Sequence, residues 1–394
     1  MAQSGSGAQS YLAVIKQDPA TPRTIPATPA LQKINFISDS LGMKAKTKKS
    51  KHIRNDRMST GVTLTGFDIG GGYPFEFQYE NSKNDELLAG ALMAQSWSTP
   101  IVDADISAGT FTIAGAVLDL SGAVVKPTII NGQCLKISGT TTNGENDGFY
   151  QFFVTGAANV YTVVPPPAAN ETFAVGVVAN GSMIRNGSFK QPFYLERGHT
   201  DIAEYFKFLG MVVDKFSLDF KDQTDVTGNF DFVGLDLKPE QATETGAVYT
   251  DVTDTPVFST STNLKEVFID GVKQEGCFIK DFDFTLDNKI TAKTGLGIYG
   301  ACDTTAHQLN IAGKIKMYFE NTAMFEKFKA GTPFALRWTV MDANGHGYIF
   351  TLPRLQLSDD KINVKDVDSD IFDDGAYIAS ADNVTGCMIQ IDKF

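Results

Sequence analysis

Apolar and polar residues alternate in many short segments of this chain, and this alternation restricts what the chain can fold into. In YPFEFQYE (73–80), Phe75, Phe77 and Tyr79 fall on one face of an extended strand, and the polar residues between them fall on the other. Similar segments are LGMVVDKFSLDF (209–220), GCFIKDFDFTLD (276–287) and HQLNIAGKIKMYFE (307–320). The 36 Gly and 29 Phe residues also favour strands joined by many turns. The sequence therefore predicts a mainly β protein.

One strand-to-helix unit occurs twice, as YPFEFQYENSKNDELLAGALMAQSW (73–97) and KIKMYFENTAMFEKFKAGTPFALRW (314–338). Each copy passes from alternating residues through Glu-Asn into a short amphipathic segment and ends at one of the two Trp residues. The residues matched by this alignment are Phe75 with Ile315, Phe77 with Met317, Tyr79 with Phe319, Glu80 with Glu320, Asn81 with Asn321, and Trp97 with Trp338. We interpret the unit as an internal duplication, with helix capping expected at the Glu-Asn corners.

Composition divides the chain into five segments. Residues 1–30 include QDPATPRTIPATPA (17–30), whose four prolines predict an extended arm, either disordered or docked on a neighbour. Residues 31–100 form the first part of one β unit, and residues 191–262 continue it and add connecting loops. Residues 101–190, rich in Gly, Ala, Thr and Val, form a small inserted all-β module. Residues 263–394 form the second unit.

Glycines and basic residues mark two predicted connections in the first unit. Gly70-Gly71-Gly72 predicts a turn between the strand in 61–69 and the strand in 73–80. KAKTKKSKHIRNDR (44–57) predicts a mobile hairpin loop that is solvated or bound to a partner, because it has no aromatic residue on which a base could stack. Its basic residues are Lys44, Lys46, Lys48, Lys49, Lys51, Arg54 and Arg57.

No catalytic, metal or cofactor motif is found. The four His residues are isolated, the four Cys residues form no CxxC pair, and no phosphate loop or GxSxG sequence occurs. KDVDSDIFDDG (365–375) begins like a calcium loop but has Ile371 where that loop needs Gly. No apolar run approaches the ~18–20 residues of a membrane span, and the N-terminus does not resemble a signal peptide. We expect a structural protein, not an enzyme, made in a cytoplasm.

The order of these segments resembles the tail tube proteins of long-tailed, siphovirus-like bacteriophages. The resemblance covers nearly the whole chain. The segments that carry it are the Ala-Thr-Pro-Ala arm (20–30), INFISDSLGM (34–43), the charged segment ending in IRNDR (53–57), FEFQYEN with DELLAGAL (75–92), VTGNFDFVG (226–234), VFIDGV (267–272), DFDFTLDN (281–288) and MYFENTAMFEKFKAGTPFAL (317–336).

The resemblance implies duplicated β-sandwich or half-barrel units, each with a short flanking helix. It implies rings that stack into a hollow tube in the virion tail, assembled in the host cytoplasm, which conducts genomic double-stranded DNA from capsid to host. The implied partners are other copies of the chain and the tail terminator, tape-measure and baseplate proteins, with no membrane. Because family rings hold six tube domains, a duplicated chain predicts a trimeric, pseudo-sixfold ring, with a hexamer as the alternative.

A DNA channel should present carboxylates, because each cation that contacts a phosphate strengthens binding. The net charge of −12 agrees with this expectation. The candidate lumen acids are Glu76, Asp219, Asp231, Asp281, Asp283 and Glu320. The basic segment 44–57 is then expected to contact the adjacent ring. The alternative function is a β-rich surface adhesin or a glycan-binding module; for an enzyme such as a glycoside hydrolase the sequence offers no positive signal.

Overall fold

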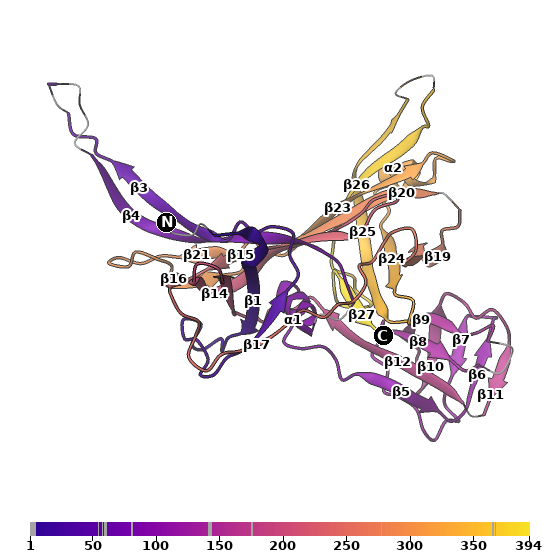
Figure 1. The fold of residues 1–394 in the computed structure, drawn as a ribbon. Helices are drawn as coiled ribbons and strands as arrows, with labels where there is room; N and C mark the ends of the chain where they lie inside the picture. Colours follow the sequence, from indigo (N-terminus) through magenta and orange to yellow (C-terminus); the bar gives the residue numbers. More distant parts are fainter. Residues whose placement is uncertain are drawn as a thin grey trace.

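The computed structural model describes residues 5–53, 55, 56, 58, 61–79, 82–140, 144–174, 176–276, 278–364, 366 and 368–394. Its regular structure is almost entirely β-sheet, which confirms the expected mainly β fold. In this described part the helices are α1 (Ser82–Ala91), α2 (Ala323–Ala330) and the single 3-10 turn η1 (Gly7–Gln9). Figure 1 shows two β units side by side, with a smaller β module beneath the second.

Two sheets of the first unit share one long strand, β14 (Glu204–Phe220). Its first half pairs with β13 and β16, and its second half pairs with β15. The first sheet continues from β13 to β1, β2 and β17, and the second continues from β15 to β4 and β3. The other strands of this unit are β1 (Ser10–Lys16), β2 (Ala30–Ile34), β3 (Gly42–Lys49), β4 (Val62–Glu76), β13 (Phe193–His199), β15 (Thr227–Gly234), β16 (Asp236–Glu240) and β17 (Val248–Thr250).

The second unit has the same arrangement around β25 (Gly347–Asn363). The first half of β25 pairs with β24 and β27, and its second half pairs with β26. β24 continues to β18 and β19, while β26 continues to β23 and β20. The other strands are β18 (Leu264–Ile269), β19 (Val272–Lys273), β20 (Ile279–Asp287), β23 (Asn310–Tyr318), β24 (Phe334–Met341), β26 (Phe372–Ala379) and β27 (Gln390–Lys393), with the small pair β21 (Thr291–Lys293) and β22 (Asp303–Thr305) between β20 and β23.

The irregularities in the two long strands fall at matching positions. The β13–β14 register shifts between Phe193 and Leu195, and the β24–β25 register shifts between Phe334 and Leu336. On the other side, the register shifts after Val213 in β14 and after Leu357 in β25, a constant offset of 144 residues. Because β-bulges are specific local features of a strand pair, two in the same places show that both units have one plan.

The register of this duplication differs from the predicted alignment by two residues. Following the strand pairings outward from the second irregularity matches Gly72 with Lys314, Tyr73 with Ile315, Phe75 with Met317, and Phe77 with Phe319. A shift of two keeps every side chain on its own face, so alternation alone could not distinguish the two alignments.

The two Trp residues do not occupy equivalent positions, so that prediction is wrong. Trp338 lies fully buried in β24, where the β13–β14 and β24–β25 registers match it with Arg197 of β13. Trp97 lies half-buried between α1 and the strand β5 (Ile101–Ile106), and its indole N–H donates to the carbonyl of Asp85 at 3.0 Å. The cause is the inserted module, which separates α1 from β13, whereas α2 passes almost directly into β24.

The Glu-Asn corners are only partly visible. Glu80 and Asn81 lie outside the described residues. Glu320 and Asn321 are exposed ahead of α2, and the Asn321 side chain accepts the N–H of Ala323 at 2.9 Å.

Three local predictions are corrected. Residues 10–16 are not an arm but the core strand β1, in which Leu12, Ala13 and Val14 are buried between β13 and β2. The triple glycine is not a turn, because β4 runs through it without a break. The segment from Lys44 to Lys49 is not a loop but most of β3.

Glycine is needed within β4 because neighbouring backbone comes very close. A Cβ atom on Gly71 would lie 2.2 Å from the carbonyl oxygen of Ser40, and one on Gly72 would lie 2.2 Å from that of Phe230. Gly71 also has φ of +117°, which L side chains rarely adopt. The glycines therefore allow a continuous strand to bend past its neighbours.

The inserted module has its own core. Its strands are β5 (Ile101–Ile106), β6 (Gly109–Thr112), β7 (Val117–Asp119), β8 (Cys134–Ser138), β9 (Gly148–Val154), β10 (Val160–Val164), β11 (Glu171–Phe173) and β12 (Val177–Arg185). The buried residues of this core all fall between Ile106 and Ala179. β12 leaves the module and pairs with β27, so the module is attached to the second unit (Figure 1).

A buried carboxyl lies where the module meets the second unit. Asp392 of β27 accepts the Cys134 N–H at 3.0 Å and a Gln390 amide N–H at 2.6 Å. Burial raises the pKa of Asp392 to about 7. Burial, with the nearby Asp360 carboxyl, also raises the pKa of Asp373.

These raised pKa values predict that stability falls as pH rises. Between pH about 4 and 7 the folded state keeps protons that the unfolded chain releases, so the free energy of unfolding decreases with pH across this window. Asp392→Asn removes one of the two groups and should reduce that decrease by about 2–4 kcal/mol. Urea unfolding of dilute protein at pH 4.5, 6 and 7.5 measures it. If the free energy of unfolding falls with pH by the same amount in the variant and in the wild type, Asp392 is ionised in the folded protein.

Candidate functional site

The two units are joined into one long sheet. The second half of β14 pairs with β20, which gives the strand order β3-β4-β15-β14-β20-β23-β26-β25. We call the β14–β20 pair the internal joint. It runs antiparallel from Lys215 opposite Asp287 to Phe220 opposite Phe282. Backbone pairing across the joint makes the sheet continuous between units that are otherwise repeats.

Side chains on one face of the internal joint close the core. Phe216 and Leu286, paired in the register, are both fully buried. The Phe220 and Phe282 rings stack with centroids 4.5 Å apart. On the other face, the Lys215 ammonium lies 3.9 Å from the Asp287 carboxylate. The joint therefore has an apolar side and a charged side.

The predicted lumen acids lie on this charged face. Each one alternates with buried aromatic or aliphatic residues of its strand, such as Phe75, Leu218, Phe230 and Phe282. The acids placed this way are Glu76, Asp219, Asp231, Asp281 and Asp283. Glu320 instead follows the end of β23 and is exposed. Sequence alternation thus predicted the face, although it did not predict which acids meet.

Lysines interrupt the acids on the same face. β23 carries Lys314 opposite Asp283, and Lys316 opposite both Asp281 and Asp374. These residues surround a depression of about 410 Å³, together with Asp219, Asp359 and Lys361. The face therefore carries lysines among its acids, whereas the sequence predicted a channel surface of carboxylates.

Like charges remain close at the internal joint. Asp283 lies directly opposite Asp219, and burial together with the Asp219 charge raises the pKa of Asp283, while Lys314 opposes that shift. Asp219 has its own partner in Lys221, 3.4 Å away. Lysines thus lie near both of these acids, Asp219 and Asp283.

The long sheet ends in two edges. Within the described residues, β3 pairs only with β4, and β25 beyond Leu355 pairs only with β26. Figure 1 shows the β3–β4 and β25–β26 hairpins at opposite ends of the molecule. A sheet with two unpaired edges can add further strands on either side.

The basic segment lies at one of these edges. Lys44, Lys46, Lys48 and Lys49 are exposed on β3, and Lys51 follows it. Lys46 forms an ion pair with Asp68 of β4 at 2.5 Å. Arg54 and Arg57 lie outside the described residues. The lysines from Lys44 to Lys49 therefore lie on a strand at the edge of the sheet, where another molecule can approach.

Sequence reasoning missed an acid pair at the other edge. Asp360 and Asp373 occupy inward positions of β25 and β26 that match Phe216 and Gly228 of the first unit. Burial and the neighbouring Asp360 carboxyl raise the pKa of Asp373. The available signal was the break in alternation, since both acids stand where their strands require apolar residues.

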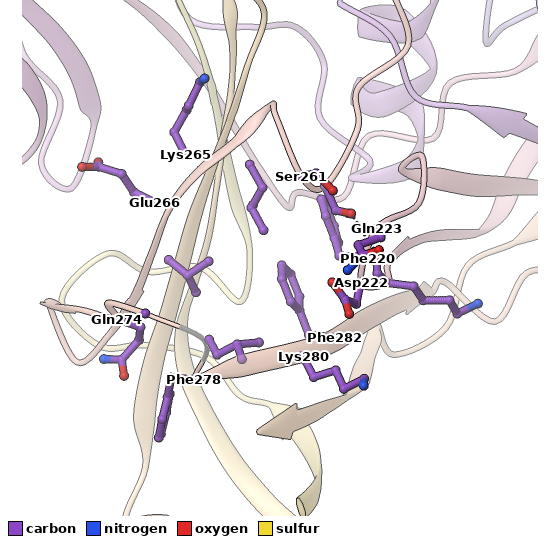
Figure 2. Close-up of a pocket in the computed structure, with 16 residues that line it drawn as sticks. Phe220, Asp222, Gln223, Ser261, Lys265, Glu266, Gln274, Phe278, Lys280 and Phe282 are labelled. Atoms are coloured by element: carbon purple, nitrogen blue, oxygen red, sulfur yellow. Dashed lines mark hydrogen bonds between the residues drawn. The ribbon is translucent and has the colours of Figure 1, made fainter. Parts of the chain in front are cut away.

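A pocket of about 220 Å³ at the end of the internal joint does not have the character of a catalytic site. Figure 2 shows Phe220 and Phe282 within it, while Lys265, Glu266 and Lys280 are spread around its rim. In the part of the chain that the structure describes, no three His, Cys, Asp or Glu side chains gather as a possible metal site. Neither described helix has the length and apolar character of a membrane span.

Comparison with known proteins shows which family the chain belongs to. No curated protein matches the chain. A family model described as phage tail tube protein matches residues 7–385, which is nearly the whole sequence. This agrees with the resemblance found from the order of segments; the siphovirus-like tail type stays a prediction. The chain therefore belongs to the phage tail tube protein family and is a structural component of a phage tail.

Proposed function

We propose that copies of this chain join edge to edge into closed rings, and that the rings stack into a hollow tube. The observation that carries this proposal is the continuous sheet with a free edge at each end. Strand pairing between copies would satisfy the unpaired backbone groups of both edges, and closure of the ring would leave no edge exposed. Each copy then uses two different edges, which is the geometry of a ring with rotational symmetry.

A ring of three copies is the stoichiometry that we propose, with a hexamer as the alternative. The support is the repeated strand plan, because each chain supplies two tube units that already lie in one sheet. Three chains then give six units and a pseudo-sixfold ring. The internal joint makes half of the contacts between units, and contacts between copies make the other half.

The charged face of the long sheet lines the bore in this proposal, and double-stranded DNA passes along it from capsid to host cell. Two properties of the face favour passage without binding. Its lysines are opposite carboxylates, so they are less available to phosphates, and the chain as a whole has a net charge of −12. The inserted module, attached to the second unit away from this face, then decorates the outside.

The remaining assignments follow from this role. The tube would be assembled in the host cytoplasm and would contact the tail terminator, tape-measure and baseplate proteins of a siphovirus-like tail. The lysines that follow Lys44 in this segment, from Lys46 to Lys51, would reach the acidic surface of the adjacent ring. The alternative of an adhesin or glycan-binding module has less support, because the family match extends over the inserted residues as well.

Electron microscopy of the purified protein tests the proposal directly. We expect rings or tubes with a bore, and averaged end views with threefold symmetry and six units. A sixfold ring with twelve units would overturn the trimer but keep the tube. A protein that stays monomeric at high concentration would overturn the tube itself.

Charge reversal on the proposed bore should make the tube retain DNA. Asp219→Lys combined with Asp231→Lys adds cations that can contact phosphates, and the gain should fall steeply with salt. Co-sedimentation of tubes with linear DNA at low salt measures it, and we expect at least a tenfold increase. The matched control is Asp105→Lys with Glu145→Lys on the exposed module, which makes the same change in net charge. Equal retention by both variants would show that the acids do not line the bore.

The lysines of β3 should support stacking between rings. Replacing Lys46, Lys48, Lys49 and Lys51 with Ala should raise the protein concentration needed for tube growth several-fold at low salt. The difference from wild type should shrink at high salt, where exposed charges are screened. Light scattering across a salt series measures it. Normal tube growth of the variant at every ionic strength would remove this segment from the stacking contact.

A further inference from the structure

The internal joint is a template for the contact between two copies. Because both units have the same plan, each strand of the joint has a counterpart at one free edge. β25 corresponds to β14 with the constant offset of 144 residues, so Asp359 corresponds to Lys215. The free edge of β25 is therefore the position where β14 binds β20.

β3 corresponds to β20 by the same reasoning. Gly42 pairs with Gly70, and Thr285 pairs with Ala312, and these two pairs occupy matching places in the units. Counting along the strands from there, Lys44 corresponds to Asp287. The free edge of β3 is the position through which β20 binds β14.

We propose that the β25 edge of one copy pairs antiparallel with the β3 edge of a second copy, with Asp359 opposite Lys44. Transfer of the internal register also sets Lys361 opposite Gly42, and Ile362 opposite Leu41. This inference rests on the proposed ring, and adds to it the two strands and their register.

The charges at the two edges support this register. Inside the chain, Lys215 of the β14 strand faces Asp287 of the β20 strand. At the matching positions of the free edges, β25 carries the acid, Asp359, and β3 carries the cation, Lys44. Both places therefore have one acid opposite one lysine, but the strand that carries the acid is exchanged. Shifting the register by two residues would set Asp359 opposite Gly42 or Lys46. Every other pair would then differ from its equivalent in the β14–β20 register.

The reversal also favours the correct partner strand. β3 with a second β3 would bring Lys44 and its neighbouring lysines together. Like charges directly opposite in a sheet are destabilising. The Asp359 carboxylate is now held by Lys361 at 2.5 Å on its own strand, and both side chains are exposed enough to turn toward a new partner.

The apolar side of the contact is only partly matched. Leu41 and Ile362 stand where the internal joint has Phe284 and Leu218. Met43, 41% exposed in the single chain, stands where the joint has the fully buried Leu286. Asp360 is the exception, since it replaces Phe216 and is directed toward Asp373. The contact between copies is thus more polar than the internal joint, as expected for a surface that must stay soluble before assembly.

Cysteine cross-linking tests the register. Lys44→Cys and Asp359→Cys are combined in a chain with Cys277 and Cys302 changed to Ser, which leaves the buried Cys134 and Cys387. Directly opposed residues have Cβ atoms about 4.5–5.5 Å apart, close to disulfide range, whereas diagonal neighbours are about 7–8 Å apart. The two edges lie at opposite ends of the molecule, so no disulfide can form within one chain (Figure 1).

We expect assembled protein to give covalent oligomers in non-reducing gels after mild oxidation, at about ten times the yield of a control chain with Lys46→Cys in place of Lys44→Cys. A second readout is charge exchange: Lys44→Asp or Asp359→Lys alone should impair ring formation, and the two together should restore it. Rings that cross-link equally through the control pair, or not at all, overturn the register while the proposed ring stands. Wild-type protein that forms no rings overturns both.

Discussion

Backbone pairing between β14 and β20 is the interaction on which the rest of the structure depends. It turns two repeated sandwiches into one sheet, and it gives that sheet a single charged face and two free edges. The long strands β14 and β25 each take part in two sheets. Each strand therefore connects the long sheet with its charged face to the second sheet of its unit. In the proposed ring, joining two units in one chain would also make half of the contacts between units independent of protein concentration.

Strand content and the buried faces could be predicted from the sequence, whereas register could not. Alternation placed Phe75 and Met317 on core faces, yet their equivalence was missed because a shift of two residues leaves the same faces buried. The two Trp residues suggested a false match for a related reason. Spacing along the chain does not show which residues are equivalent here, because the inserted module separates α1 from β13. The strand pairings instead show that Trp338 corresponds to Arg197.

The candidate site was predictable to the same extent. The face that holds Asp219, Asp231 and Asp283 follows from period two, which is a local property. The lysines that face them come from β23, and that neighbourhood depends on pairing between strands distant in the sequence. The three glycines of β4 were wrongly predicted to form a turn. They are needed because the backbone of Ser40 and Phe230 approaches them closely, and that contact cannot be read from the local sequence.

The inserted module occurs in only one of the two units, and this has a consequence for the exterior of any assembly. A gene that encodes both units in one chain can lengthen one connection and leave its counterpart short, as the direct passage from α2 to β24 illustrates. A homogeneous ring of single units has no such freedom, because every change appears at every position. In the proposed ring, the outer surface would therefore carry half as many projections as there are units.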